Sequence, residues 1–272
     1  MGLIFKSNTW GSGEVRGRQI AQRLGVPCDD RISPESIVVV VKQRVLDAEE
    51  TLDYVKSLWI DVVDGYGLIE DLLAHPRMKA IAIGPMSKAF IRRRVMNRLE
   101  TIPEHHCNFE NWTRPKDRDV RVVGAMCYPG NFDVDSEEIR KALRSIGMEF
   151  RLATFFRRRE DVVRFYKKID IQLCIRFWRG IGQKEPPELK NPLKLENAGS
   201  FQIPTVAFPE PCFLEEFGED TFIHILTMDD IVESCKVLKS NRRYYEDYAM
   251  RAWKRAQDYH IDRIAPLYLE LD

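Results

Sequence analysis

Short apolar runs alternate with amphipathic helical stretches along most of the chain. The clearest strand is the run at 36–41, whose continuous β-branched residues fit a sheet that is covered on both faces. A helix is predicted at 48–58, where Leu52, Val55 and Leu58 recur at helical spacing after an acidic first turn. Short strands that alternate with helices in this way predict an α/β fold with mainly parallel sheets.

The same alternation occurs in two successive halves. In the first half we expect strands at 3–5, 36–41, 59–63, 80–83 and 100–105, and helices at 14–24, 48–58, 68–73 and 87–99, the last of them capped by Ser87. In the second half we expect strands at 120–126, 148–154, 169–175, 205–208 and 222–226. Helices are expected there at 135–146, 161–168, 193–201, 215–217, 229–239 and from 242 onwards, with breaks near Ile261 and Pro266.

A polar, proline-containing segment at 111–119 separates the two halves. It predicts one domain over residues 1–115 and another over 118–249, each of them a Rossmann-like α/β domain. Ligands of parallel sheets bind beyond the C-terminal ends of the strands. Two such domains would therefore hold a ligand in the cleft between them.

The composition narrows the class of protein. The 272 residues carry 42 Lys and Arg against 42 Asp and Glu, and this balance argues against a nucleic-acid partner. No apolar run approaches the ~18–20 residues that span a bilayer, and the start has no secretory signal. The six cysteines are scattered singly, as is typical of reduced core thiols. We therefore expect a cytoplasmic protein without a membrane span.

Two glycines and an arginine follow the first predicted strand. Gly11 and Gly13 lie in the loop before the first helix, where backbone N–H groups can approach an anion or a sugar closely. The loop matches neither GxGxxG nor a P-loop, so an ordinary flexible turn is an equally good interpretation. Arg16 lies on the first helical turn, where the helix dipole disfavours a cation, and this position indicates an anion nearby.

Carboxylates and histidines mark two further strand ends. Asp61 and Asp64 are able to orient hydroxyl groups or act as a base, although an Asp-Gly turn is the simpler explanation and the one we favour. His105 and His106 point to opposite faces of their strand, so only one of them can face a ligand. We take His105 and Asp64 as the candidate catalytic residues. No third side chain at metal-ligand spacing accompanies the histidines, so we expect no metal.

The stretch 190–211 is the most informative part of the sequence. Lys194 and Asn197 fall three positions apart on one face of a predicted helix. A lysine can neutralise a diphosphate, and a helix N-terminus adds oriented N–H donors. Arg179, in the loop after the predicted strand 169–175, is a second candidate cation, although a charge run is more often a solvated face.

This stretch resembles the C-terminal domain of GT-B-type glycosyltransferases of families 1 and 4, which read K-L-x-N-A-x-x-x-G-x-P-x-x-A-x-P-E. The matching residues are Lys194, Leu195, Asn197, Ala198, Pro204, Ala207, Pro209 and Glu210. Looser similarity extends to 11–24, 99–106, 229–231 and 259–268. Two features depart from the pattern. Glu188 and Glu196 have the separation of the two glutamates of retaining members but are one residue out of register, and Gln202 replaces the usual glycine.

The resemblance implies two Rossmann-like domains that face each other across a cleft, with a C-terminal helix at 250–272 that crosses back and completes the acceptor-binding first domain. It implies metal-independent transfer of a sugar from a nucleotide-diphosphate sugar, with no cofactor besides this donor. The acceptor would be a glycan, a lipid-linked glycan or a small molecule. Together with the glycines and cations above, the candidate donor-binding residues are Lys194, Asn197, Arg179, Glu210, Gly11, Gly13 and Arg16. The alternatives are a catalytically inactive nucleotide- or glycan-binding homologue and a nucleotide-sugar epimerase.

Overall fold

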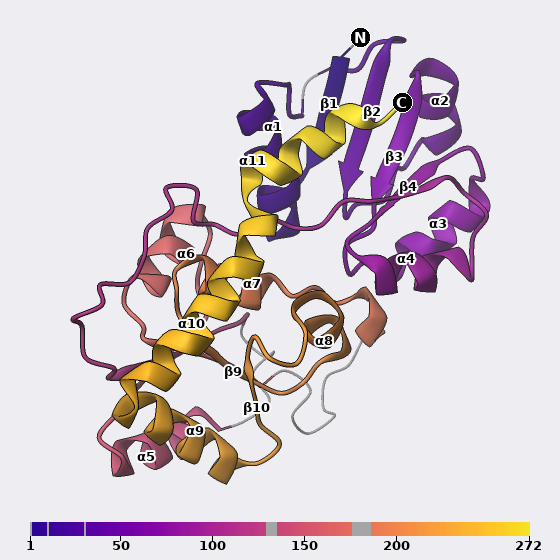
Figure 1. Ribbon diagram of the computed structural model, residues 1–272. Helices are drawn as coiled ribbons and strands as arrows, with labels where there is room; N and C mark the ends of the chain where they lie inside the picture. Colours follow the sequence, from indigo (N-terminus) through magenta and orange to yellow (C-terminus); the bar gives the residue numbers. More distant parts are fainter. Residues whose placement is uncertain (1, 10, 30, 129–134, 176–185) are drawn as a thin grey trace. The chain divides into compact units, whose positions relative to one another are not determined.

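The computed structural model describes residues 2–9, 11–29, 31–128, 135–175 and 186–272 (Figure 1). The chain divides into two compact units. Unit 1 comprises Met1–His105, Glu185–Asn191 and Ile261–Asp272, and unit 2 comprises His106–Lys184 and Pro192–His260. Each unit contains a five-stranded sheet in which every pair of neighbouring strands is parallel. The predicted α/β fold with two parallel sheets is confirmed.

The sheet of unit 1 has the order β1-β2-β3-β4-β5, so the strands follow one another across it without a reversal. Its strands are β1 (Gly2–Ser7), β2 (Ser36–Val41), β3 (Ser57–Asp61), β4 (Lys79–Ala82) and β5 (Leu99–Thr101). Its helices are the π-helix η1 (Gly13–Gln19), α1 (Ile20–Leu24), α2 (Ala48–Tyr54), α3 (Leu68–Ala74), α4 (Pro85–Arg92) and the 3₁₀-helix η2 (Pro187–Leu189). Apolar residues of α2, α3 and α4 form one buried core with the sheet, and Leu189 of the segment Glu185–Asn191 is part of it.

The sheet of unit 2 has the order β10-β9-β8-β6-β7. Its strands are β6 (Val122–Met126), β7 (Glu149–Ala153), β8 (Ile171–Cys174), β9 (Thr205–Ala207) and β10 (Ile223–His224). Its helices are α5 (Ser136–Ser145), α6 (Arg159–Tyr166), α7 (Leu193–Ser200), α8 (Pro211–Phe217), α9 (Met228–Ser240) and α10 (Arg242–Ala256). The chain moves from β6 outward to β7 and then returns to β8 on the other side of β6. Open α/β sheets bind ligands beyond the strand C-termini at such a reversal, so the C-terminal edge of this sheet is a candidate ligand-binding edge.

The chain ends in a series of helices, drawn from orange to yellow in Figure 1. After α10 come η3 (Gln257–Tyr259), α11 (Ile261–Ile264) and η4 (Ala265–Glu270). The part from Ile261 onwards belongs to unit 1. There the ring of Tyr268 packs edge-on against Phe5 of β1, with 5.2 Å between the ring centroids. Among the helices of the described residues, none has the length and apolar character needed to cross a membrane.

Several elements differ in extent from their predictions. The helix predicted at 48–58 ends at Tyr54, because Ser57 and Leu58 already pair with β2 at the start of β3. The helix predicted at 87–99 covers Pro85–Arg92, with Gly84 at its N-cap. The prediction of Ser87 as the N-cap is wrong, since this residue lies within the first turn and its Oγ bonds the backbone of Gly84. The strand predicted at 100–105 is only Leu99–Thr101.

The two units divide the chain at His105–His106, whereas the sequence places the boundary within 111–119. Side-chain bonds hold this polar segment to unit 2. Asn108 Nδ2 donates to the carbonyls of Trp112 and Ser200, and Arg114 Nε donates to Asp170. A polar segment is firmly anchored when its polar groups have partners, and local composition does not reveal those partners.

Candidate functional site

The C-terminal edge of the unit 2 sheet carries two of the predicted donor-binding residues. Helix α7 follows β8 and leads back to the start of β9, so its first turn, with Lys194, lies at the edge where the strands end. Glu210 follows β9 at the same edge and is the N-cap residue of α8. The strand connections thus bring Lys194 and Glu210 to one edge of one sheet.

Lys194 is half-buried in the first turn of α7. Within the part of the chain that the structure describes, its side chain makes no hydrogen bond or ion pair. In this first turn the N–H groups of Leu195 and Glu196 bond the Pro192 carbonyl, and the N–H of Lys194 lies ahead of the helical hydrogen-bond ladder. An ammonium group next to such an N–H group is suited to bind a phosphate oxygen.

Two contacts fix the position of α7. Asn197 is 6% exposed, and its Oδ1 accepts the N–H of Cys107 at 2.7 Å. Gly199 allows α7 to approach α10 closely, because a Cβ there would lie 2.6 Å from the carbonyl oxygen of Ala252. The amide oxygen of Asn197 is therefore occupied by the backbone of Cys107. The predicted contact of Asn197 with the donor would have to come from its amide nitrogen.

The remaining predicted donor residues of unit 2 are less informative. Glu210 is 1% exposed, and the Sγ of Cys212 lies 3.9 Å from its Oε2. Arg179 falls outside the described residues.

In unit 1, the packing of the first loop itself accounts for Gly11 and Gly13. Gly11 has a φ of 49°, in the left-handed region that favours glycine. A Cβ on Gly13 would lie 2.2 Å from Asn8 Oδ1 and 2.5 Å from the Asn8 carbonyl oxygen. Both glycines are needed for the loop to fold as it does, whether or not a ligand binds there.

Arg16 forms a buried ion pair within unit 1. Its Nε donates to Asp61 Oδ2 at 2.8 Å, and its Nη2 donates to the carbonyl of Ile102 at 2.8 Å. The hydroxyl of Tyr268 donates to the same carboxylate oxygen at 3.0 Å. The anion that the position of Arg16 indicates is therefore Asp61, at the end of β3. Arg16 is 1% exposed, and these bonds hold its guanidinium within unit 1.

Asp64, just beyond β3, lies between two lysines. It pairs with Lys42, and Lys190 Nζ lies 3.8 Å from its Oδ2. Burial opposes ionisation, but the two lysines outweigh it and lower the pKa of the Asp64 carboxyl. Val63, immediately before it, has a φ of 51°. A β-branched residue rarely adopts this left-handed conformation, and such strain is often found at functional sites.

Glu104 and His105 follow β5 and are both buried. Glu104 is 2% exposed, and its Oε2 has no hydrogen-bond partner. Burial raises the pKa of Glu104 to about 7, and the attraction of Arg16 only partly offsets this effect. His105 is 1% exposed, with Nε2 2.9 Å from the Val15 carbonyl oxygen. Because a carbonyl only accepts, Nε2 carries the proton in this contact.

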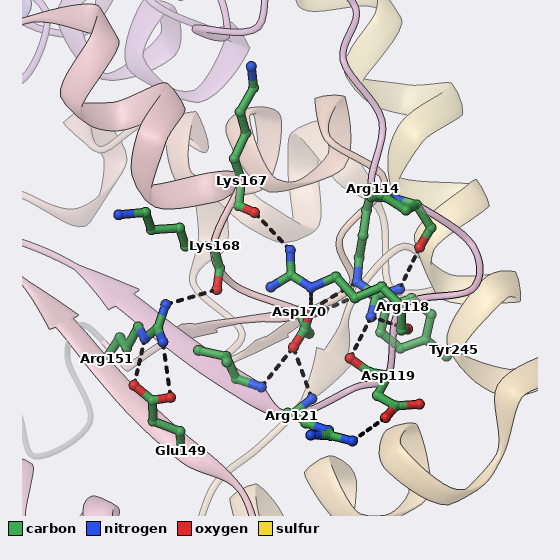
Figure 2. A network of polar contacts seen from close by, with 12 residues as sticks. Arg114, Arg118, Asp119, Arg121, Glu149, Arg151, Lys167, Lys168, Asp170 and Tyr245 are labelled. Carbon is green, nitrogen blue, oxygen red and sulfur yellow. Dashed lines mark hydrogen bonds and ion pairs between the residues drawn. The ribbon is translucent and has the colours of Figure 1, made fainter.

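A second buried arginine–carboxylate pair, in unit 2, is shown in Figure 2. Asp170 Oδ1 accepts from Arg114 Nε at 3.0 Å and pairs with Arg118 Nε at 2.9 Å. Its Oδ2 accepts the backbone N–H groups of Arg121 and Val122, at 2.9 and 2.8 Å. Asp170 precedes β8, so this cluster lies at the N-terminal edge of the sheet, away from the edge where ligands of parallel sheets bind.

Glu104 is not among the functional residues predicted from the sequence. Its only local signal is its place between a strand and two histidines, and a single Glu in a loop is normally exposed. The structure reveals it through burial and the groups around it. Among the described residues, no group of three or more His, Cys, Asp or Glu is arranged to hold a metal ion.

No protein-family model matches the sequence, and no curated protein matches it. Solved structures do match the fold. The Anabaena protein HepE in complex with UDP-glucose has a TM-score of 0.68 at 11% sequence identity, over 99% of this chain and 98% of HepE. TarM of S. aureus has a TM-score of 0.60 at 12% identity, over 88% of this chain and 55% of TarM.

The pneumococcal O-GlcNAc transferase GtfA, in complex with UDP and GlcNAc, has a TM-score of 0.56 at 11% identity, over 93% of this chain and 58% of GtfA. The chain thus spans little more than half the length of TarM and GtfA and nearly all of HepE. These similarities show that the chain has the GT-B fold, as the resemblance in its sequence predicts.

Proposed function

We propose that this protein is a glycosyltransferase, of the kind found in families 1 and 4, that moves a sugar from a nucleotide-diphosphate sugar to an acceptor. One observation supports the proposal: Lys194 is half-buried in the first turn of α7, at the C-terminal edge of the unit 2 sheet. Solved structures of the same fold contain UDP-glucose, or UDP with a sugar, which supports a donor of this class.

In the proposed reaction, an acceptor oxygen forms a bond to the anomeric carbon while the bond to the diphosphate breaks. Lys194 and the N–H groups of α7 stabilise the negative charge that develops on the leaving diphosphate. This stabilisation needs no metal ion. Glu210 would accept hydrogen bonds from donor hydroxyls, and the proposed contribution of Arg179 rests on the sequence alone.

Unit 1 would present the acceptor at the C-terminal edge of its own sheet. Asp64, held anionic by two lysines, is suited to orient a hydroxyl group. His105 would take up the proton that the acceptor hydroxyl loses. The acceptor class, whether glycan, lipid-linked glycan or small molecule, and the cytoplasmic location stay predictions from the sequence.

Replacing Lys194 tests the proposal. Lys194→Ala should lower kcat/KM for the nucleotide sugar at least about 100-fold, because a preorganised charge on the leaving group is worth several kcal/mol. Thermal unfolding should be nearly unchanged, since the side chain is only half-buried and makes no bond to the described residues. Lys236→Ala, on the exposed side of α9, is the matched control and should leave turnover intact. Undiminished turnover of Lys194→Ala would overturn the leaving-group role.

A non-catalytic nucleotide-binding protein is the second candidate. Two observations favour it: Asn197 uses its amide oxygen to hold backbone, and Arg16 is engaged inside unit 1. Calorimetric titration with UDP separates the two candidates when combined with a turnover assay. Binding without transfer or hydrolysis supports the second candidate, and conversion of the donor sugar without an acceptor identifies an epimerase. A protein that binds no nucleoside diphosphate contradicts all three.

A further inference from the structure

Three consecutive arginines of unit 1 carry positive charge without a carboxylate partner. Arg92 is the last residue of α4, Arg93 and Arg94 follow it, and all three side chains are exposed. Within the part of the chain that the structure describes, none of them forms an ion pair with Asp or Glu. Arg77 and Arg98, in contrast, each pair with a carboxylate. The three arginines therefore form a local excess of positive charge on a chain whose formal net charge is zero.

Backbone carbonyls fix two of these guanidinium groups. Arg92 Nη1 donates to the carbonyl of Asn97 at 3.0 Å, and Arg94 Nη1 donates to that of Phe90 at 2.9 Å. The Arg94 guanidinium also lies 3.6 Å from the centre of the Phe90 ring. A guanidinium carries several N–H donors, and each of these bonds uses one of them. The planar fork of donors matches the paired oxygens of a phosphate.

Two exposed apolar side chains lie on the segments next to the arginines. Met96 is 89% exposed, and Leu73, in the last turn of α3, is 57% exposed. Asn97, which is buried, joins these segments: its Nδ2 donates to the carbonyl of Leu72 at 3.1 Å, and its own carbonyl accepts from Arg92. The end of α3 and the segment after α4 are therefore held together. We call the exposed residues of these two segments the α4-end surface: Leu73, Arg92, Arg93, Arg94 and Met96.

Cations combined with exposed apolar side chains are typical of a surface that binds an anionic membrane. Headgroup phosphates attract the arginines, and the apolar side chains leave water for the boundary between headgroups and acyl chains. A nucleic acid offers the same phosphates, but it gives Met96 and Leu73 no apolar surroundings. A folded protein partner would favour an apolar centre enriched in aromatic residues, and the α4-end surface includes no aromatic side chain. The combination of charge and apolar surface therefore favours a lipid surface.

We propose that the α4-end surface attaches this protein reversibly to an anionic phospholipid bilayer. The guanidinium groups of Arg92, Arg93 and Arg94 bind headgroup phosphates, while Met96 and Leu73 enter the boundary below them. The attachment is peripheral, because two apolar side chains bury far less apolar surface than a spanning helix. It is independent of the proposed sugar transfer, since no residue of the α4-end surface belongs to the candidate site.

Sedimentation of the full chain with lipid vesicles tests this proposal. The protein should sediment with vesicles of phosphatidylcholine that contain about 30% phosphatidylglycerol, since anionic headgroups attract the arginines. It should stay in solution with vesicles of phosphatidylcholine alone, and about 0.5 M KCl should release it, because salt screens exposed charges. The triple variant Arg92→Gln, Arg93→Gln, Arg94→Gln should bind about 100-fold more weakly, since each cation near an anionic surface contributes roughly five-fold.

The matched control removes the same charge elsewhere. Arg121→Gln, Arg164→Gln and Arg242→Gln together replace three exposed arginines that pair with carboxylates, and this variant should bind the vesicles like the wild type. The double variant Met96→Ser, Leu73→Ser should bind about 10-fold more weakly than the wild type, because less apolar surface leaves water. Thermal unfolding of each variant checks that it is folded.

Equal binding to both kinds of vesicle, binding to neither, or the same loss in the arginine variant and its control would overturn the proposal. So would a serine variant that binds as tightly as the wild type, since the arginines would then recognise phosphate alone, as on a nucleic acid. If the arginine variant does not fold, the release by salt and the serine variant still decide the outcome.

Discussion

Two buried arginine–aspartate pairs, one in each unit, differ in how completely their polar atoms are bonded. In unit 2, Asp170 Oδ1 has a hydrogen bond from Arg114 and an ion pair with Arg118, and Oδ2 accepts two backbone N–H groups. In unit 1, Asp61 Oδ1 and Arg16 Nη1 lack hydrogen-bond partners. Both pairs are nearly inaccessible to solvent, so burial alone does not distinguish them.

The difference follows the position of each pair on its sheet. The saturated pair lies at the N-terminal edge of the unit 2 sheet, where it ties the segment after His106 to β6 and β8. The unsaturated pair lies at the C-terminal edge of the unit 1 sheet, where ligands of parallel sheets bind. Saturated polar networks stabilise and specify a fold, whereas unbonded polar atoms in a native structure call for a separate explanation. The comparison therefore indicates that the unit 2 pair is a stabilising network, whereas the unbonded atoms of the unit 1 pair still need an explanation.

The largest effect should come from Asp170→Asn. The substitution leaves Arg114 buried without its anion and places an amide group against the N–H groups of Arg121 and Val122. We expect a loss of about 3–5 kcal/mol in the free energy of unfolding, measured by urea denaturation at pH 7. Asp119→Asn, an exposed neighbour, is the control. A loss no larger than that of the control would mean that the network does not hold unit 2 together.

The next largest change in the free energy of unfolding is expected for Glu104→Gln, and it depends on pH. The pKa of Glu104 is raised from 4.5 to about 7, so the stability contributed by the neutral acid is present below 4.5 and is lost as pH rises through 7. Glutamine does not ionise. The variant should exceed the wild type by up to about 3 kcal/mol at pH 8, since one pKa unit is worth ~1.4 kcal/mol. The two proteins should unfold alike at pH 4, and equal stability at pH 8 would argue against burial of a protonated acid.

Asp61→Asn should cost less than Asp170→Asn, although both remove the anion of a buried arginine. Arg16 already attracts the charge of Glu104, so we expect Glu104 to ionise and take over as its counterion. We expect about 1–2 kcal/mol at pH 7, the typical cost of losing a buried hydrogen bond to a charged group. Combining the change with Glu104→Gln should cost more than the two single changes together. Additive single and double variants would show that Glu104 provides no such replacement.

The smallest effect is expected at the exposed rim of the unit 2 network. Glu149 and Arg151 form a bidentate pair there (Figure 2), with side chains 55% and 40% exposed. Exposed pairs contribute about 0.2–1 kcal/mol, so Glu149→Gln should change the free energy of unfolding by less than about 1 kcal/mol. A cost comparable to that of Asp170→Asn would show that the network extends to its exposed members.

The sequence predicts where helices and strands occur better than it predicts which segments they pair with. Continuous β-branched residues mark β2 with its observed bounds, because a buried parallel strand has a local signature. Helical spacing of apolar residues predicted a helix over 48–58, and this prediction runs into β3. The spacing cannot reveal that Ser57 and Leu58 pair with β2, because that pairing depends on residues far away in the sequence. Gln202 replaces a glycine of the glycosyltransferase pattern that the sequence resembles. Its φ of 57° lies in the left-handed region that favours glycine, which accounts for glycine in that pattern.

The candidate site was predictable only where its residues form a local pattern. Lys194 is recognisable because it lies at the start of a helix that is followed at fixed spacing by Pro204 and a strand. The identity of the anion beside Arg16 was not predictable, since Asp61 lies 45 positions away. Glu104 carries no local sign of burial, because its enclosure depends on groups from η1, β3 and η4 that meet only in the folded unit.

The division of the chain between the units has a consequence for how the protein is synthesised. Unit 1 takes its core residue Leu189 from Glu185–Asn191 and its Tyr268 from the final helical segment. During translation, the five strands of this unit are therefore synthesised well before the segments Glu185–Asn191 and Ile261–Asp272 that complete its core. Unit 1 is completed only after translation has passed Tyr268, and until then the Arg16–Asp61 pair has no cover from that ring. A chain cut after residue 115 would keep the five strands but lack Leu189 and Tyr268, so the core of unit 1 would be incomplete.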